Sequence, residues 1–272
     1  MNYNERQYLN LLDKIYKYGM DTGDRTGTGM RSLFGESMEF DLREGFPLLT
    51  TKKMFVRGVF GELLWFLSGS TSGKELREKY NIHFWKEWEN ENGELNNIYG
   101  KQWIRWKDSR GGIFNQIEYV INEIKNNPTS RRILFTGWNA PEMQWKDTAL
   151  PCCHSTVVQF YVEDGFLSMY HYQRSGDMFL GVPVNIASYA TLLTIIAQQC
   201  NLKPGIMKHT IGVAHIYHNH LKQVEEQLSR TPYEPPKLII KRKPDSIFDY
   251  QIEDFEVVNY KHHPPIKGEV AV

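Results

Sequence analysis

Two adjacent cysteines, Cys152 and Cys153, are followed by His154 just before a predicted strand. A cysteine thiolate is both a nucleophile and a metal ligand, so these residues can support covalent catalysis. Adjacent cysteines lack the spacing of two to four residues that turns two sulfurs toward one zinc ion, and we expect no metal. Free cysteine is also a common packing residue. Position alone leaves the catalytic and packing interpretations open.

Groups that suit a phosphate occur at three separate places in the chain. Arg174 and Ser175 end a predicted strand, where a guanidinium fork and a hydroxyl can both donate to phosphate oxygens. Arg25 lies in the loop segment DRTGTG, which can close over an anion. Arg131 and Arg132 begin another predicted strand, although an isolated arginine pair is usually solvated surface.

Three polar side chains could recognise a small molecule. Asn185 offers a donor and an acceptor, the complement of an imide edge such as that of uracil. Asparagine also favours helix N-caps, and by position alone the cap is the better interpretation. His215 and Tyr217 lie two residues apart in a predicted strand, so both should lie on the same face.

Glu62 stands inside an apolar segment at 56–67 that predicts a buried helix. A carboxylate there must be paired, bound to water or shifted in pKa. Trp85 and Trp88 in the segment FWKEW can form core or a wall that stacks on a flat ring. Without further context, the core interpretation is favoured for both.

These residues require a framework of helices and strands. Helical spacing predicts helices over 5–18, 56–67, 117–124, 185–200 and 221–228. Aromatic and β-branched segments predict strands at MRSLFGESMEF, RILFTGW, TVVQFYV, FLSMYHYQ, HTIGVAHIY, KLIIK and FEVVNY. Because the predicted helices and strands do not alternate strictly, we expect an α+β fold with a mixed sheet, in one domain spanning residues 1–272.

Composition narrows the class of protein. The 272 residues are 41% hydrophobic, and 32 basic residues balance 32 acidic ones, which disfavours a nucleic-acid-binding protein. We expect no membrane span and no secretory signal, because no uninterrupted apolar run is long enough and the start lacks the basic-then-apolar pattern. Three cysteines cannot form a disulfide framework, so a cytoplasmic location is expected.

Taken in order, eleven motifs resemble those of the thymidylate synthase family, from about Leu9 to Val272. They are DRTGTG, FPLLTTKK, ELLWFLSGST, YGKQW, SRR, PCCH, YQRSGD, FLGVPVNIASY, HIYHNH, PKLIIKRKP and the terminal VAV. The resemblance implies a homodimer in which one face of the sheet forms the interface. It also implies methylation of dUMP at C5 with 5,10-methylenetetrahydrofolate as co-substrate.

The resemblance also implies a role for each matching residue. Cys153 would be the nucleophile, and the proton network would consist of Glu62, Tyr99 and His154. The nucleotide would contact Arg25, Gln173, Arg174, Ser175, Asn185, His215 and Tyr217, together with Arg131 and Arg132 from the partner. The folate would contact Lys52, Trp85, Trp88, Asp177, Leu180, Gly181, Ala271 and Val272, of which Asp177, like Arg174, would also take part in catalysis.

The sequence departs from the family pattern around the one-carbon chemistry. Cys152 replaces a usual proline, one residue is added between Cys153 and the next strand, and the preceding loop is longer, so Cys152 is the alternative nucleophile. Val213 replaces an acidic residue, Val184 replaces an aromatic one, and Phe55 stands where a basic or polar residue is common. Two alternatives therefore stand beside methylation: a hydroxymethylase of the same family, and an inactive nucleotide- or RNA-binding protein. Asn185 favours uracil over cytosine for either enzyme.

Overall fold

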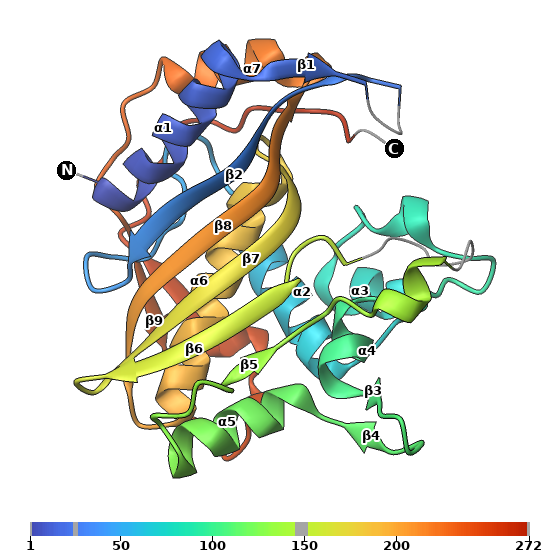
Figure 1. Cartoon of the computed structure of the whole chain (residues 1–272). Helices are drawn as coiled ribbons and strands as arrows, with labels where there is room; N and C mark the ends of the chain where they lie inside the picture. The colour runs from blue at the N-terminus through green and yellow to red at the C-terminus, as the bar shows by residue number, and fades with distance from the viewer. Residues whose placement is uncertain (1, 24–26, 145–151, 271–272) are drawn as a thin grey trace.

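A six-stranded mixed sheet forms the centre of the molecule (Figure 1). The computed structural model describes residues 2–23, 27–144 and 152–270. The strand order is β1-β2-β8-β7-β6-β5, with β7 and β8 parallel and the other neighbours antiparallel. The bounds are β1 (Met20–Thr22), β2 (Met30–Asp41), β5 (Leu134–Phe135), β6 (Val157–Glu163), β7 (Phe166–Asp177) and β8 (Lys203–Tyr217). The predicted mixed sheet in an α+β fold is confirmed.

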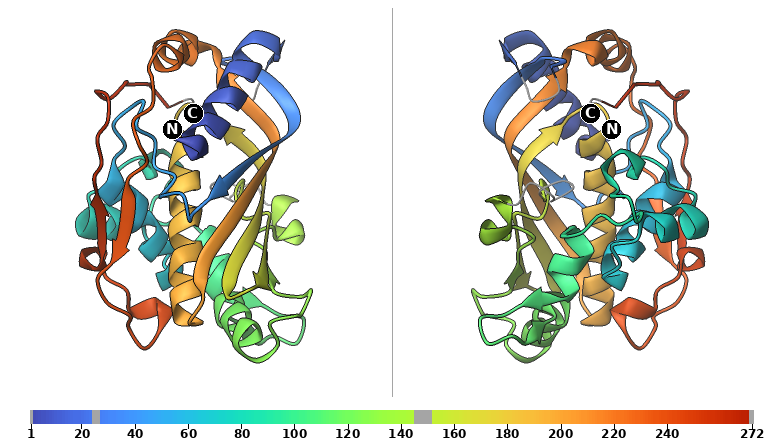
Figure 2. Two further views of the ribbon diagram at one scale, coloured as in Figure 1. Left: turned by 90° about the vertical axis from the view of Figure 1, so that its left-hand side faces the viewer. Right: turned by 90° about the vertical axis from the view of Figure 1, so that its right-hand side faces the viewer.

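Helices cover one face of this sheet. The buried helix α6 (Gly181–Gln199) packs on β7 and β8, and α2 (Val56–Ser68) packs behind α6 (Figure 2). By length and composition alone α6 could cross a membrane, but most of it is buried in this fold. Further helices are α1 (Tyr3–Tyr18), α3 (Gly73–Tyr80), α4 (Tyr99–Ile104), α5 (Gln116–Asn126) and α7 (Leu221–Leu228); the short pairs are β3 (Trp106–Lys107) with β4 (Ile113–Phe114), and β9 (Lys237–Ile240) with β10 (Phe255–Val258).

Side-chain alternation gives the sheet two different faces. Along β7, Met169, His171 and Gln173 are buried toward α6, whereas Tyr170 is 41% exposed on the opposite face. Tyr161 on β6 lies on the same outer face and is 62% exposed. We name this the outer sheet face. Its aromatic surface is unusual for a face that meets only water.

A buried carboxylate fixes the loop that leads from β2 into α2. Glu5 on α1 accepts hydrogen bonds from the backbone N–H groups of Thr50 and Thr51, at 2.9 and 2.8 Å, and from both threonine hydroxyls. Because these four donors lie on two consecutive residues, they fix the backbone there, and Asn2 Nδ2 also donates to the same carboxylate at 3.0 Å. The next residue, Lys52, is thereby directed into the interior, where only 5% of it is exposed.

Candidate active site

Cys153 lies at the entrance to β6 with its thiol half-buried. The Tyr99 hydroxyl, at the start of α4, accepts the Cys153 backbone N–H at 2.9 Å and lies 3.2 Å from Sγ. Since the tyrosine oxygen already accepts from the backbone, its own hydrogen is available to the sulfur. The Cys153 carbonyl accepts the backbone N–H of Arg174 at 2.8 Å. Cys153 and Arg174, which lies near the end of β7, are therefore neighbours, as a nucleophile and an anion-binding group should be.

Cys152 has a different environment from its neighbour. It is 2% exposed, and burial raises the pKa of its thiol well above its usual range, with a further contribution from Cys153. A buried, protonated thiol is a poor nucleophile. Burial therefore favours the packing interpretation for Cys152, whereas Cys153 retains access to solvent and to Tyr99.

A tight turn follows the cysteine. Ser155 has φ 57°, a left-handed conformation that is uncommon outside glycine. Three hydrogen bonds hold it: its N–H donates to His171, its carbonyl accepts from Gly137, and its hydroxyl accepts from Trp103 Nε1 at 3.1 Å. Strained backbone that is supported in this way is typical of functional sites.

His154 is enclosed by aromatic rings. Its ring stacks on Tyr99 with centroids 3.8 Å apart and planes 6° from parallel, and its Nδ1 lies 2.8 Å from the Tyr189 hydroxyl. Burial lowers the pKa of His154 to about 3. The imidazole is therefore neutral at physiological pH and acts through hydrogen bonding rather than through charge.

Glu62 is buried at 3% exposure in α2 and accepts a hydrogen bond from Trp85 Nε1 at 2.7 Å. Burial raises the pKa of Glu62 to about 7, and the hydrogen bond from Trp85 opposes that rise. A carboxyl that titrates near neutrality can both give and take a proton. The sequence-based expectation of a paired or pKa-shifted carboxyl is confirmed. Trp85 is core, as favoured, and also binds Glu62, whereas Trp88 is half-buried against it.

Lys52 and Asp177 lie at the start of α6. Lys52 Nζ donates to the Phe179 carbonyl and lies 3.8 Å from the centroid of the Phe179 ring. Burial lowers the pKa of Lys52 to about 7, although Asp177 acts in the opposite direction. Asp177 Oδ1 accepts the backbone N–H groups of Phe179 and Leu180, which ends β7 and leads into the helix at Gly181.

Asn185 lies inside α6, beyond its first turn, so the interpretation of Asn185 as an N-cap is wrong. The helix begins at Gly181 because the Asp177 carboxylate already binds the preceding backbone. The amide oxygen of Asn185 accepts from Gln173 Nε2 at 3.1 Å, which connects α6 to β7. Asn185 is buried at 8% exposure, where an amide that recognises an imide edge should lie.

Of the remaining residues predicted to contact the substrates, some lie together on the sheet, some are exposed and some lie outside the described residues. His215 and Tyr217 lie on one face of β8 with ring centroids 4.9 Å apart, as their spacing predicts. Ser175 lies beside Arg174 at the end of β7, and the Arg174 guanidinium carbon is 5.5 Å from the Trp138 ring centroid. Both arginines of the pair, Arg131 and Arg132, are exposed in a turn before β5. The predictions for Arg25, Ala271 and Val272 lie outside the described residues.

The C-terminal segment returns toward the start of α6. His220 Nε2 lies 2.8 Å from the Glu269 carbonyl oxygen, and the His220 ring packs on Phe179 with centroids 5.1 Å apart. Gly268 lies so close to Phe179 that a Cβ there would be 2.8 Å from its ring. The segment is therefore anchored just before the residues predicted to contact folate.

Three buried residues were missed by the sequence analysis: Tyr189, His171 and His209. They connect His154 to Gln173 through stacked rings, with Tyr189 to His171 at 3.7 Å and His171 to His209 at 4.3 Å between centroids. His209 Nε2 lies 2.9 Å from Gln173 Oε1. Strand alternation was the available signal, since each histidine occupies an inward position among apolar residues.

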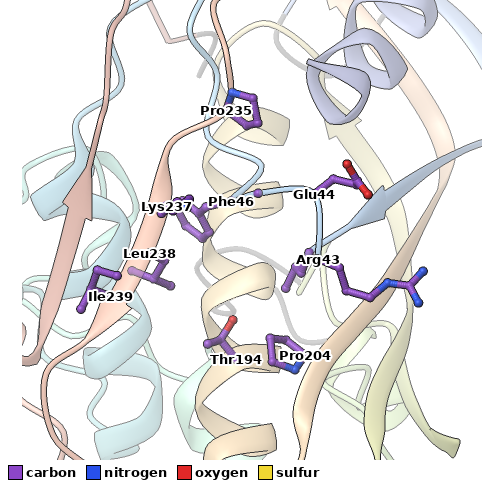
Figure 3. Close-up of a pocket in the computed structure, with 11 residues that line it drawn as sticks. Arg43, Glu44, Phe46, Thr194, Pro204, Pro235, Lys237, Leu238 and Ile239 are labelled. Atoms are coloured by element: carbon purple, nitrogen blue, oxygen red, sulfur yellow. The ribbon is translucent and has the colours of Figure 1, made fainter. Parts of the chain in front are cut away.

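A hollow of about 260 Å³ lies elsewhere, between the end of β2, α6 and β9 (Figure 3). Its lining includes Phe46, Thr194 and Leu238, and none of the predicted site residues. Arg43 at its edge is bound to Asp41. Volume alone does not make a site, and the convergent titratable groups lie around Cys153 instead.

One comparison with known proteins bears on this arrangement. The sequence model of a protein family described as Thymidylate synthase matches residues 6–272, nearly the whole chain.

Proposed function

This chain belongs to the thymidylate synthase family, and on that premise we propose that it converts dUMP to thymidylate, with 5,10-methylenetetrahydrofolate as co-substrate. The observation that carries the proposal is the position of Cys153, which has an accessible thiol beside the Tyr99 hydroxyl and a backbone hydrogen bond to Arg174. The coarser assignment, a methyltransferase-type enzyme of nucleotide biosynthesis, follows from the family.

The chemistry begins at the sulfur. The Cys153 thiolate forms a bond to C6 of the pyrimidine, and the C5–C6 electron pair moves toward C5 and O4. Glu62 in its neutral form supplies a proton to the charge at O4, directly or through water. After C5 has bonded to the one-carbon unit, the C5 proton leaves and the bond from that carbon to the folate nitrogen breaks, which leaves an exocyclic methylene on C5. Hydride from the tetrahydrofolate then adds to this methylene as the bond from sulfur to C6 breaks, which restores the ring and the thiolate and leaves dihydrofolate.

Recognition is divided among three groups. Arg174 and Ser175 bind the phosphate, together with Arg25, and His215 and Tyr217 bind the ribose hydroxyl. Asn185, which accepts a hydrogen bond from Gln173, binds the uracil edge. Folate supplies the one-carbon unit and the hydride. The half-buried Trp88 ring and the Asp177 carboxylate fit a flat pterin with N–H donors, and Lys52, Trp85, Leu180, Gly181 and the C-terminus enclose it.

A homodimer completes the site in this proposal. Gln159 on the outer sheet face donates to the Arg131 carbonyl at 3.1 Å, so the arginine turn borders that face. If two copies pair through their exposed tyrosines, Tyr161 and Tyr170, each can extend Arg131 and Arg132 toward the other's phosphate site. The three free cysteines fit the cytoplasmic location that we propose.

The alternative reaction is hydroxymethylation. Val184, next to Asn185, and Val213 are only half-buried, and small side chains there leave room for water. Water that adds to the exocyclic methylene on C5 before hydride does would give 5-hydroxymethyl-dUMP. We favour methylation because the tryptophans and the terminal VAV segment that exclude water are retained.

Mass spectrometry of the product formed from dUMP and 5,10-methylenetetrahydrofolate tests the proposal. Thymidylate with dihydrofolate is the expected result. The hydroxymethyl product with tetrahydrofolate would establish the alternative. No product and no dUMP binding, with retention of RNA in a filter-binding assay, would refute both and indicate a binding protein.

A further inference from the structure

Two fully buried histidines stack face to face beneath the substrate-recognition residues. His171 on β7 and His209 on β8 are each 0% exposed, with ring planes 20° from parallel. The proposed reaction assigns neither a role. Buried imidazoles are costly unless their nitrogens are satisfied, so the position of each proton is informative.

The proton of His171 is fixed by the backbone. The Ser155 N–H donates to His171 Nε2 at 3.3 Å, so that nitrogen is an acceptor without a proton. Burial lowers the pKa of His171 well below its usual range, and the ring is neutral. Its single proton is therefore on Nδ1.

The proton of His209 is fixed through Gln173. Gln173 Nε2 donates to the Ser175 carbonyl at 2.9 Å, and because a carbonyl only accepts, the amide has one orientation. Gln173 Oε1 consequently faces His209 Nε2, which must donate. Burial lowers the pKa of His209 to about 3, so this ring is neutral too and its Nδ1 carries no proton.

The two remaining nitrogens are complementary. His171 Nδ1 is a donor and His209 Nδ1 an acceptor, and neither has a hydrogen-bond partner among the described residues. Buried polar groups that lack a protein partner are usually satisfied by ordered water. One water molecule can accept from the first nitrogen and donate to the second.

We propose that a water molecule bridges the Nδ1 atoms of His171 and His209, beside the stacked rings, and completes a one-way hydrogen-bond chain that orients the Asn185 amide. The chain runs from Ser155 through His171, the water, His209 and Gln173 to Asn185 Oδ1. It directs Asn185 Nδ2 toward the substrate. That group can donate to the O4 oxygen of uracil but not to the amino group of cytosine, so His209 is a positioning residue for base selection.

The inference rests on the proposed function, which supplies its substrate. The first experiment tests base selection by measuring kcat/KM for dUMP and for dCMP. His209→Phe removes the donor to Gln173 and should reduce the preference for dUMP about tenfold. His209→Gln, whose amide nitrogen replaces Nε2, should retain most of the preference. Met207→Ala, at the neighbouring inward position of β8, should cost stability without changing the ratio. An unchanged ratio in His209→Phe, or an equal fall in Met207→Ala, would overturn the inference.

A second measurement needs no substrate. Nitrogen-15 NMR of histidine-labelled protein should show opposite neutral tautomers, Nδ1–H for His171 and Nε2–H for His209, and a long-lived water close to the His171 Nδ1 proton. Identical tautomers, or a charged ring at neutral pH, would refute the chain. Opposite tautomers in a protein that does not convert dUMP would refute the proposed function alone.

Discussion

The residues around Cys153 and the arginine turn show two ways of placing functional groups. We name Cys153, Tyr99, His154 and Glu62 the nucleophile corner; there every side chain has a partner within the chain, and burial has shifted the pKa values of Tyr99, His154 and Glu62. At positions 131–132 the side chains are exposed, and the backbone is held by Gln159, which donates to the Arg131 carbonyl, and by Ser130, which accepts from the Arg132 N–H. A single chain can therefore preorganise the corner, whereas the role that we propose for the arginines depends on a second surface.

The largest effect is expected at the nucleophile. Cys153→Ala should abolish turnover, by at least about 10⁴-fold, because no other accessible thiol adjoins Tyr99 among the described residues. Mass spectrometry should also show that 5-fluoro-dUMP no longer forms a covalent adduct. The matched control is Cys152→Ala, which should keep most of the activity. The opposite pattern would make Cys152 the nucleophile.

Glu62 comes next. Glu62→Gln should lower kcat by about 10²- to 10⁴-fold, because the amide cannot give or take the proton. For the unmodified protein, kcat should fall as pH rises through about 7, because the neutral acid is lost. Trp85→Phe removes the hydrogen bond that opposes the shift and should move this inflection to higher pH. An inflection that survives in Glu62→Gln would assign it to another group.

The same carboxyl makes stability depend on pH. Its folded pKa of about 7 exceeds its ordinary value of 4.5, so its contribution is complete below about pH 4.5 and is lost as pH rises through 7. The loss is on the order of 3 kcal/mol. Urea unfolding of Glu62→Gln and the unmodified protein should diverge across this window. Parallel stability curves would contradict the shift.

The arginine turn is tested by mixing two inactive proteins. The double variant Arg131→Ala with Arg132→Ala should lose about 10²- to 10³-fold in kcat/KM, as expected for charge-assisted hydrogen bonds to phosphate. If the turn acts across a dimer, refolding it with Cys153→Ala should restore activity to roughly a quarter, because half the dimers then carry one complete site. No restoration would place these arginines outside the partner's site.

The smallest effect is expected where recognition depends on one amide. Asn185→Asp should admit dCMP and reduce the preference for dUMP about ten- to hundredfold, because a protonated carboxyl offers the cytosine edge a donor and an acceptor. Competition between dUMP and dCMP in a single assay measures this directly. Ser188→Ala, on the same helix but outside the proposed contacts, is the control. Equal shifts in both variants would refute the assignment.

The sequence predicted several features that depend on local pattern, although the N-cap interpretation of Asn185 was wrong. The apolar segment around Glu62 predicted its burial, and the spacing of His215 and Tyr217 predicted their shared face. Features that depend on distant contacts were not predictable. Trp85 as the partner of Glu62 depends on packing between separate segments. The segment RILFTGW gave a strand of only two residues because Thr136 and Gly137 bind the Ser155 turn instead.

The hydrogen bond from His220 Nε2 to the Glu269 carbonyl ties the backbone at residue 269 to the start of α6, where the His220 ring packs on Phe179. A tether of this kind raises the effective concentration, at the site, of any group attached beyond it. His220→Ala would remove the tether and lower the effective concentration of the predicted folate-contacting residues at their target.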